Sequence, residues 1–155
     1  MNKMSKLQTK CEAVINAPVN SIWTVITDID QLTKLNNGAV KATGRMDKQG
    51  ETRTVEVNLN GKAGTFTERL IELVPGEKTV WTIESDTMGM GKMLKETRFV
   101  TILEKINDTK TKVTNETYYR PLNIIAKIMS ALMVKPVFAK MQEQILTNIR
   151  ILTEK

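Results

Sequence analysis

Histidine is absent from this sequence of 155 residues, and cysteine occurs once, as Cys11. Histidine is the usual general base near neutral pH and the commonest metal ligand in proteins. Its absence excludes Ser-His and Cys-His nucleophilic catalysis, and with only one cysteine it argues against a zinc site. We therefore expect no metal, no cofactor and no catalytic residue of these familiar types.

Disulfides and long apolar segments are also missing. A single cysteine cannot form an internal disulfide, which fits a reducing compartment. The best candidate for a membrane-spanning segment is divided by Lys127 and Lys135, so no uncharged apolar run reaches about 18 residues. Residues 1–10 lack the apolar core of a signal peptide. These features predict a cytoplasmic protein.

Aromatic residues make up only 5% of the chain, while the formal net charge is +6. Such a charge can attract an acidic ligand, nucleic acid or an anionic membrane, or can simply favour solubility. The basic residues are spread along the chain with acidic residues between them. No basic-aromatic cluster of the nucleic-acid-binding type occurs, so we expect no nucleic-acid partner.

The longest periodic stretch is residues 122–152, which predicts a long C-terminal helix. Its first part, to Val134, is apolar almost all round, and Pro136 should kink the helix. A helix with so broad an apolar flank is expected to lie on an equally broad apolar surface. After residue 133 the apolar stripe narrows to Val134, Phe138, Met141, Ile145, Ile149 and Leu152, and Lys140, Glu143, Gln144, Thr147 and Arg150 should face water.

Most of the remaining chain has the period of two that is typical of β-strands. Residues 7–15 predict a first strand with Cys11 on its buried face, and Pro18 suits the start of a helix. The Asn60-Gly61 pair is the strongest hairpin signal. After two short helical segments, six further strands are expected over residues 39–46, 53–59, 62–73, 79–85, 93–106 and 112–120.

The order of these elements predicts the fold class. Consecutive strands joined by short turns imply an antiparallel meander, and helices kept apart from the strands imply an α+β fold. We expect one domain over residues 1–155, in which a curved antiparallel sheet of about seven strands wraps around the long C-terminal helix.

Four short segments carry a resemblance to a known family. They are Ile15-Asn16-Ala17-Pro18, the segment from Ile22 to Asp28, Lys112-Val113-Thr114, and Tyr118-Tyr119-Arg120-Pro121 before the long helix. Over essentially its whole length the chain resembles the START/SRPBCC superfamily, which includes polyketide cyclase-like and lipid-transfer proteins. The resemblance implies a helix-grip fold with a cavity between the sheet and the C-terminal helix, which binds a hydrophobic small molecule, lipid-like or polyketide-like.

Two kinds of residue are candidates for lining such a cavity. Aromatic and hydroxyl side chains on strands suit an apolar wall with a few polar groups, and the nine methionines could form a deformable wall. Each could instead be ordinary core filling, and the Met-Gly segment at residues 86–92 could be a gate or an exposed turn. The candidate ligand-binding residues are Phe66, Trp81, Met88, Met90, Phe99, Thr117, Tyr119, Met129, Met133 and Met141.

Four charged residues raise the question of catalysis. Glu96, Arg98, Glu116 and Arg120 lie on two neighbouring predicted strands and could form a buried cluster with shifted pKa values. They could equally form a solvated outer face. Gly89 and Gly91 superficially resemble a phosphate loop, but a strand rather than a helix is expected after them.

Three functions follow as hypotheses. The first is a binding module that carries or senses a hydrophobic small molecule, and we favour it over an enzyme. The second is a polyketide cyclase/aromatase or dehydratase-like enzyme, which needs at least two of Tyr119, Glu116, Arg98 and Glu96 in one cavity. The third is a protein that docks transiently on a membrane or a partner through its basic surface and Met-Gly segment.

Overall fold

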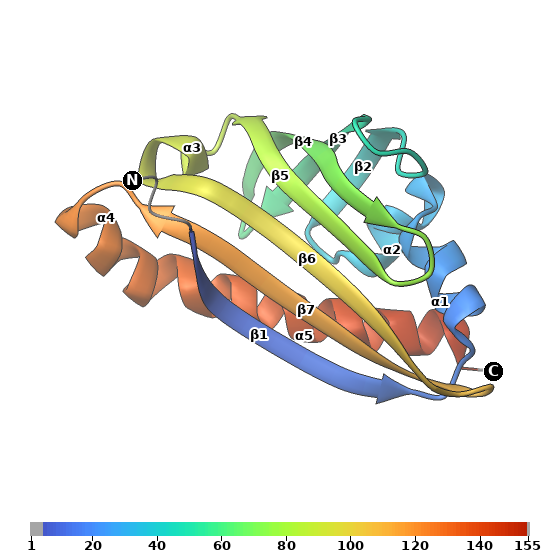
Figure 1. Ribbon diagram of the computed structural model, residues 1–155. Coiled ribbons are helices and arrows are strands. Elements are labelled where there is room, and N and C mark those ends of the chain that lie inside the picture. Colours follow the sequence, from blue (N-terminus) through green and yellow to red (C-terminus); the bar gives the residue numbers. More distant parts are fainter. Residues whose placement is uncertain (1–4, 155) are drawn as a thin grey trace.

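A seven-stranded antiparallel sheet curves around a long C-terminal helical run in the computed structural model, which describes residues 5–154 (Figure 1). The strands are β1 (Lys6–Ile15), β2 (Ala39–Gly44), β3 (Thr52–Leu59), β4 (Lys62–Val74), β5 (Lys78–Asp86), β6 (Leu94–Asn107) and β7 (Lys110–Pro121). The shorter helices are α1 (Val19–Ile26), a 3₁₀ turn (Ile29–Gln31), α2 (Leu32–Leu35) and α3 (Met90–Met93). The C-terminal run consists of α4 (Ile124–Met129), a π-helical turn (Ser130–Val134) and α5 (Lys135–Thr153).

The strands follow the order β1-β7-β6-β5-β4-β3-β2, and every neighbouring pair is antiparallel. Strands β2 to β7 pair in sequence order, as short turns require, and β1 pairs with β7. The predicted α+β helix-grip fold is therefore confirmed. The predicted strand boundaries agree with the observed ones to within about two residues.

The Asn60-Gly61 turn fixes the register between β3 and β4. Both residues have positive φ, 53° for Asn60 and 84° for Gly61, as a tight two-residue hairpin turn with the twist of the sheet requires. Leu59 then pairs with Lys62, and the pairing continues without a bulge along the hairpin. This register places the charged side chains of Arg53 and Glu68 opposite each other on the two strands.

Pro136 stands inside the helical run, as the second residue after the π-helical turn. In that turn the N–H of Lys135 donates to the carbonyl of Ser130, five residues earlier. A proline ring crowds the preceding turn of a helix and supplies no N–H. The wider turn relieves this crowding, so the helix continues past Pro136.

From Ala126 to Leu146 the buried positions of the run are four or eight residues apart, which is longer than one or two α-helical turns of 3.6 residues. The wide π-helical turn contains an extra residue and takes up part of this difference. In the first half only small side chains, Ala126 and Ser130, are buried, so the expectation that this half lies on a broad apolar surface is wrong. In the second half the buried residues are Phe138, Gln142, Leu146 and Ile149.

The core forms three clusters that surround the concave side of the sheet. The first joins β1, α1 and the end of α5, the second joins α2 to strands β3–β5, and the third packs Phe138 against the ends of β6 and β7. In the first cluster the most deeply buried residues are Ile15, Ile22, Val113 and Ile149. In the second, Leu70, Val55 and Trp81 are buried. In the third, Leu94 and Tyr119 are buried.

Candidate functional site

A cavity of about 610 Å³ lies between the sheet and α5. Its walls come from β3 to β7 on one side, from α5 on the other, and from α2 and the residues that follow it at one end. The volume falls within the range of about 300–1,000 Å³ that is usual for small-molecule sites. The cavity separates the three core clusters, which explains why the core is divided.

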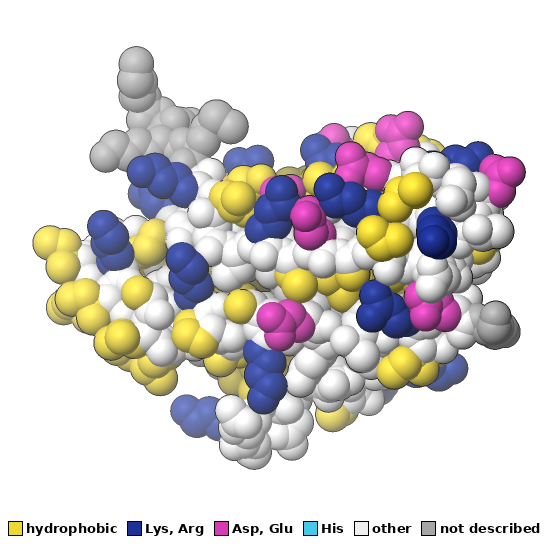
Figure 2. Space-filling model, turned by 90° about the horizontal axis from the view of Figure 1, so that it is seen from below, with side chains coloured by type: hydrophobic (Ala, Val, Ile, Leu, Met, Phe, Trp, Pro, Cys, Tyr) yellow, Lys and Arg dark blue, Asp and Glu magenta, His cyan; other side chains and the backbone are white. Residues whose placement is uncertain are grey.

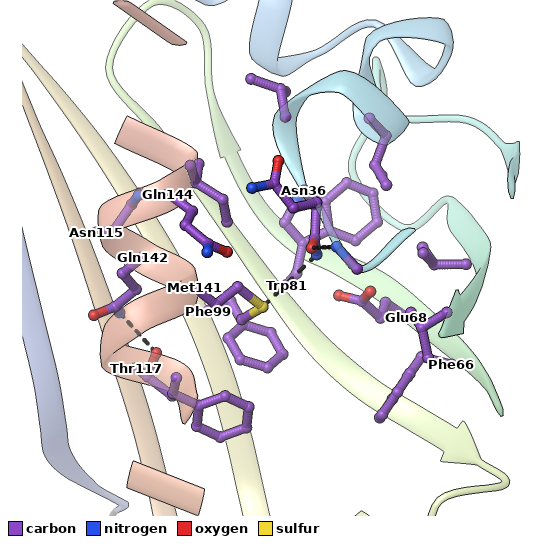
Figure 3. A pocket seen from close by; sticks show the side chains of 18 of the residues that line it. Asn36, Phe66, Glu68, Trp81, Phe99, Asn115, Thr117, Met141, Gln142 and Gln144 are labelled. Atoms are coloured by element: carbon purple, nitrogen blue, oxygen red, sulfur yellow. Dashed lines mark hydrogen bonds between the residues drawn. The ribbon is translucent and has the colours of Figure 1, made fainter. Parts of the chain in front are cut away.

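Six of the ten candidate ligand-binding residues lie on the wall of this cavity, from four different strands, α3 and α5. Trp81 is on β5 and Met141 faces it from α5 (Figure 3). The other members of this group, on β4, β6, β7 and α3, are Phe66, Phe99, Thr117 and Met90. As ligand-binding residues they remain predictions.

The other four candidates lie elsewhere. Tyr119 is fully buried between β7 and the helical run, where Ser130 Oγ donates a hydrogen bond to its hydroxyl oxygen at 2.5 Å. Met88 lies over Gly64 of β4, which has no side chain in its way. Met129 and Met133 point into solvent with 39% and 58% of their surface exposed, so neither contributes to the cavity wall.

The Met-Gly segment is tied down by one carboxylate. Asp86 accepts hydrogen bonds from the backbone N–H groups of Met88, Met90 and Gly91 at 2.8–2.9 Å. A single helical turn, α3, follows Gly89, where the sequence led us to expect a loop running directly into a strand. Because an internal carboxylate already occupies these amides, the two glycines do not form an anion site.

An ion pair on the cavity wall was missed by the sequence analysis. Arg53 Nη2 lies 3.1 Å from Glu68 Oε2, both side chains are largely buried, and the guanidinium carbon of Arg53 is 3.8 Å from the ring centre of Trp81. The sequence did contain the signal. Pairing outward from the two-residue Asn60-Gly61 turn places Arg53 opposite Glu68, and both share strand faces with apolar residues.

Three polar atoms on the cavity wall lack a protein partner within residues 5–154. They are the Arg53 Nε and Asn115 Nδ2 donors and the Gln142 Oε1 acceptor. Gln142 Nε2 donates a hydrogen bond to Thr117 Oγ1 at 2.8 Å (Figure 3). Asn115 Oδ1 accepts one from Thr101 Oγ1 at 2.9 Å. Buried polar atoms normally find partners. Because these three atoms have almost no accessible surface, a polar group in the cavity would pair with them after a small rearrangement of their side chains.

The mouth of the cavity is marked by the exposed residues of its lining. On one side these belong to the β3–β4 hairpin, with Asn58 and Asn60, and on the other to α5. Asn36, at the end of α2, reaches across and donates from Nδ2 to the sulfur of Met141 at 3.7 Å (Figure 3). Gln144, which was expected to face water, is half-buried beside this contact and lines the cavity.

Of the four charged candidates for catalysis, only Glu116 is among the residues that border the cavity, and its side chain points away from it. Thr117 and Tyr119 face the helical run, so the alternation of β7 turns Glu116 and Arg120 to the opposite face. Glu116 there accepts a hydrogen bond from Tyr118 Oη at 3.2 Å, and Arg98 pairs with Tyr118 across the sheet. Of the residues required for the enzyme hypothesis, only Tyr119 points inward.

Burial raises the pKa of Tyr119 above its usual value, although the hydrogen bond from Ser130 acts in the opposite direction. Burial also raises the pKa of the Cys11 thiol, and the nearby Glu143 carboxylate adds to this effect. A thiol with a raised pKa is a poor nucleophile. Cys11 packs instead against the first core cluster, as a small apolar residue would.

Comparison with protein families decides the wider identity. Residues 7–154 match the family described as polyketide cyclase / dehydrase and lipid transport. The chain belongs to this family. Its fold is accordingly the START-like, hydrophobic ligand-binding type. No curated protein matches the chain.

Solved structures share the fold at low sequence identity. A START superfamily protein from Mycobacterium smegmatis is 9% identical with a TM-score of 0.75, over 96% of this chain and 98% of that one. Ginseng major latex-like protein 151 from Panax ginseng is 11% identical with a TM-score of 0.77, over 99% and 100%. The Zhui aromatase/cyclase from Streptomyces sp. R1128 is 13% identical with a TM-score of 0.68, over 94% and 95%. At these identities the likeness establishes the fold alone.

Proposed function

We propose that this protein binds and carries a hydrophobic small molecule, lipid-like or polyketide-like, that has at least one polar group. The observation that carries the proposal is the cavity of about 610 Å³, whose apolar wall contains three buried polar atoms without protein partners. Apolar ligands gain most of their binding free energy from burial. The few polar atoms then fix the orientation of the ligand in the cavity.

The polar group has two candidate positions. Arg53 and Asn115 offer unpaired N–H donors, which suit a carbonyl or ether oxygen, and Gln142 offers an acceptor, which suits a hydroxyl. Glu68 already balances the charge of Arg53, so a carboxylate is not needed to neutralise it. The proposed ligand is therefore a neutral amphiphile rather than a fatty acid.

Extraction of the purified protein, followed by mass spectrometry of the intact protein and of the extract, tests this function directly. We expect a neutral apolar molecule to co-purify. Ile83, half-buried on the cavity wall, provides a blocking variant, Ile83→Trp. Ile71, on β4 outside the cavity lining, provides the matched control, Ile71→Trp.

In a titration with the neutral apolar fluorescent probe N-phenyl-1-naphthylamine, Ile83→Trp should weaken binding at least tenfold, whereas Ile71→Trp should leave it unchanged. Each variant is checked for folding by circular dichroism. Equal probe binding by the two folded variants, together with an extract free of apolar molecules, would refute the proposed function.

The enzyme alternative now depends on different residues from those expected. Within residues 5–154, Glu68 is an acid whose side chain lies in the cavity, held by Arg53. It could serve as a base for a polyketide-like substrate. Recovery of the same ligand unchanged after incubation supports a carrier, whereas a product whose formation is lost in Glu68→Gln supports an enzyme.

A further inference from the structure

The first half of the C-terminal helical run exposes an unusual amount of apolar surface. The side chains of this half that are buried against the sheet are Ala126 and Ser130. The large apolar side chains on either side of them face solvent. Ile124, Ile125 and Leu132 have 76%, 74% and 73% of their surface exposed. We call this surface the helix patch; its members are Leu122, Ile124, Ile125, Ile128, Met129, Leu132, Met133 and Val137.

The charged residues in the segment that carries the helix patch are of one sign. No Asp or Glu occurs between Glu116 and Glu143, whereas Lys127, Lys135 and Lys140 lie in this interval and are exposed. Figure 2 shows apolar side chains gathered at the α4 end of the molecule with basic side chains nearby, and acidic side chains farther toward the centre and right. Within the segment that carries the helix patch, the charged side chains are therefore all basic.

We propose that the helix patch docks this protein on the surface of an anionic lipid bilayer. A contiguous exposed apolar surface marks an interaction site, and lysines beside it match the negative surface potential of an anionic membrane. A bilayer also accepts isoleucine, leucine and methionine without shape complementarity, which a protein partner would require. Residues 122–137 would lie in the plane of the interface, over a length of about 24 Å.

A spanning orientation is not supported, since no helix within residues 5–154 is long and apolar enough to cross a bilayer. The helix patch does, however, border the cavity mouth. Val137 belongs to both, and its neighbour Pro136 and Lys140 also line the cavity. Docking would therefore bring the mouth to the membrane, although the docking itself does not depend on any ligand in the cavity.

Vesicle flotation with the full-length protein tests the inference. We expect binding to vesicles of phosphatidylcholine and phosphatidylglycerol, and at least tenfold weaker binding to vesicles of phosphatidylcholine alone. Ile125→Ser with Leu132→Ser should weaken binding at least tenfold. Ile151 is 69% exposed on α5 but outside the helix patch, so Ile151→Ser should have no effect.

The lysines are tested separately. Lys127→Gln and Lys135→Gln should each weaken binding about fivefold, and raising the salt concentration should weaken it further. Lys41→Gln and Lys48→Gln are the controls, since both lysines are exposed elsewhere, on β2 and in the turn after it. All four substitutions are at exposed positions and should leave the fold unchanged.

Three outcomes would overturn the proposal. They are equal binding to both kinds of vesicle, equal effects of Ile151→Ser and the helix-patch variants, or no vesicle binding together with a dimer by light scattering that Leu132→Ser dissociates. The last result would assign the helix patch to a second copy of this chain. The cavity-blocking variant Ile83→Trp should bind vesicles normally, which separates this inference from the proposed function.

Discussion

The two halves of the C-terminal helical run have similar apolar side chains but different surroundings. In α5, Leu146 and Ile149 are 5% and 0% exposed. By contrast, Leu132 in the π-helical turn is 73% exposed and Ile125 in α4 is 74% exposed. Both halves follow one another without a break in helical structure. Whether a segment of this run forms a helix therefore does not depend on whether its apolar side chains are buried.

The difference comes from what lies beneath each half. The second half packs against β1, β7, α1 and α2, whereas α4 packs chiefly against the end of β7 (Figure 1). Each half has one buried hydrogen bond to β7, from Ser130 to Tyr119 in the first and from Gln142 to Thr117 in the second. The apolar side chains of the helical run are thus buried where several strands and helices pack against them, as in α5. They are exposed where only the end of β7 does so, as in α4.

The largest expected effect tests this comparison with a pair of matched leucines. Leu146→Ala should lower the free energy of unfolding by about 3 kcal/mol, because it opens a cavity in the core. Leu132→Ala should change it by less than about 0.5 kcal/mol, because the side chain is already in water. Urea unfolding of both variants checks this, and similar losses would show that the first half is buried in solution.

A smaller effect is expected at the two hydrogen bonds to β7. Gln142→Ala should cost about 2 kcal/mol, because it leaves the hydroxyl of Thr117 buried without its partner. Ser130→Ala should cost about 1 kcal/mol, because it removes the hydrogen bond to Tyr119 Oη but almost no side-chain volume. Thermal or urea unfolding measures both, and a larger loss in Ser130→Ala would reverse the assigned order.

The smallest effect is a dependence of stability on alkaline pH. The pKa of Tyr119 is higher in the folded protein than in the unfolded chain because the ring is buried. Its contribution to stability is therefore complete below pH about 10 and is lost as the pH rises through the folded-state pKa. Urea unfolding at pH about 8 and about 11 should show a smaller loss for Tyr119→Phe than for the original chain, and equal losses would exclude this role. Tyr118, whose pKa is also raised by burial, is present in both proteins and serves as the internal control.

Much of the fold could be predicted because it depends on local patterns. Alternation in residues 7–15 and in the later strands, together with the Asn60-Gly61 turn, specified an antiparallel meander. The family segments then indicated where the C-terminal helix lies. Strand identity and order follow from such signals, since each strand pairs with a neighbour in sequence apart from β1.

The site was predicted less completely, for two physical reasons. The cavity is a space that side chains leave unfilled, and no residue pattern encodes its volume, so Trp81 and Tyr119 were equally good candidates although only Trp81 lines it. Burial of a helix face also depends on which strands reach it, which is why Met129 and Met133 turned out to be exposed. The Arg53–Glu68 pair, by contrast, was available from turn length and strand alternation.

The π-helical turn has a consequence for how the helix patch is aimed. It contains one more residue than an α-helical turn, so removal of Ala131, which is not part of the helix patch, would rotate the preceding segment by about 100°. Ile125 and Met129 would then take the places of Ala126 and Ser130 against the sheet, where there is room only for small side chains. The one extra residue of the π-helical turn thus sets the direction in which the helix patch faces. A one-residue deletion would change that direction without changing any side chain of the helix patch.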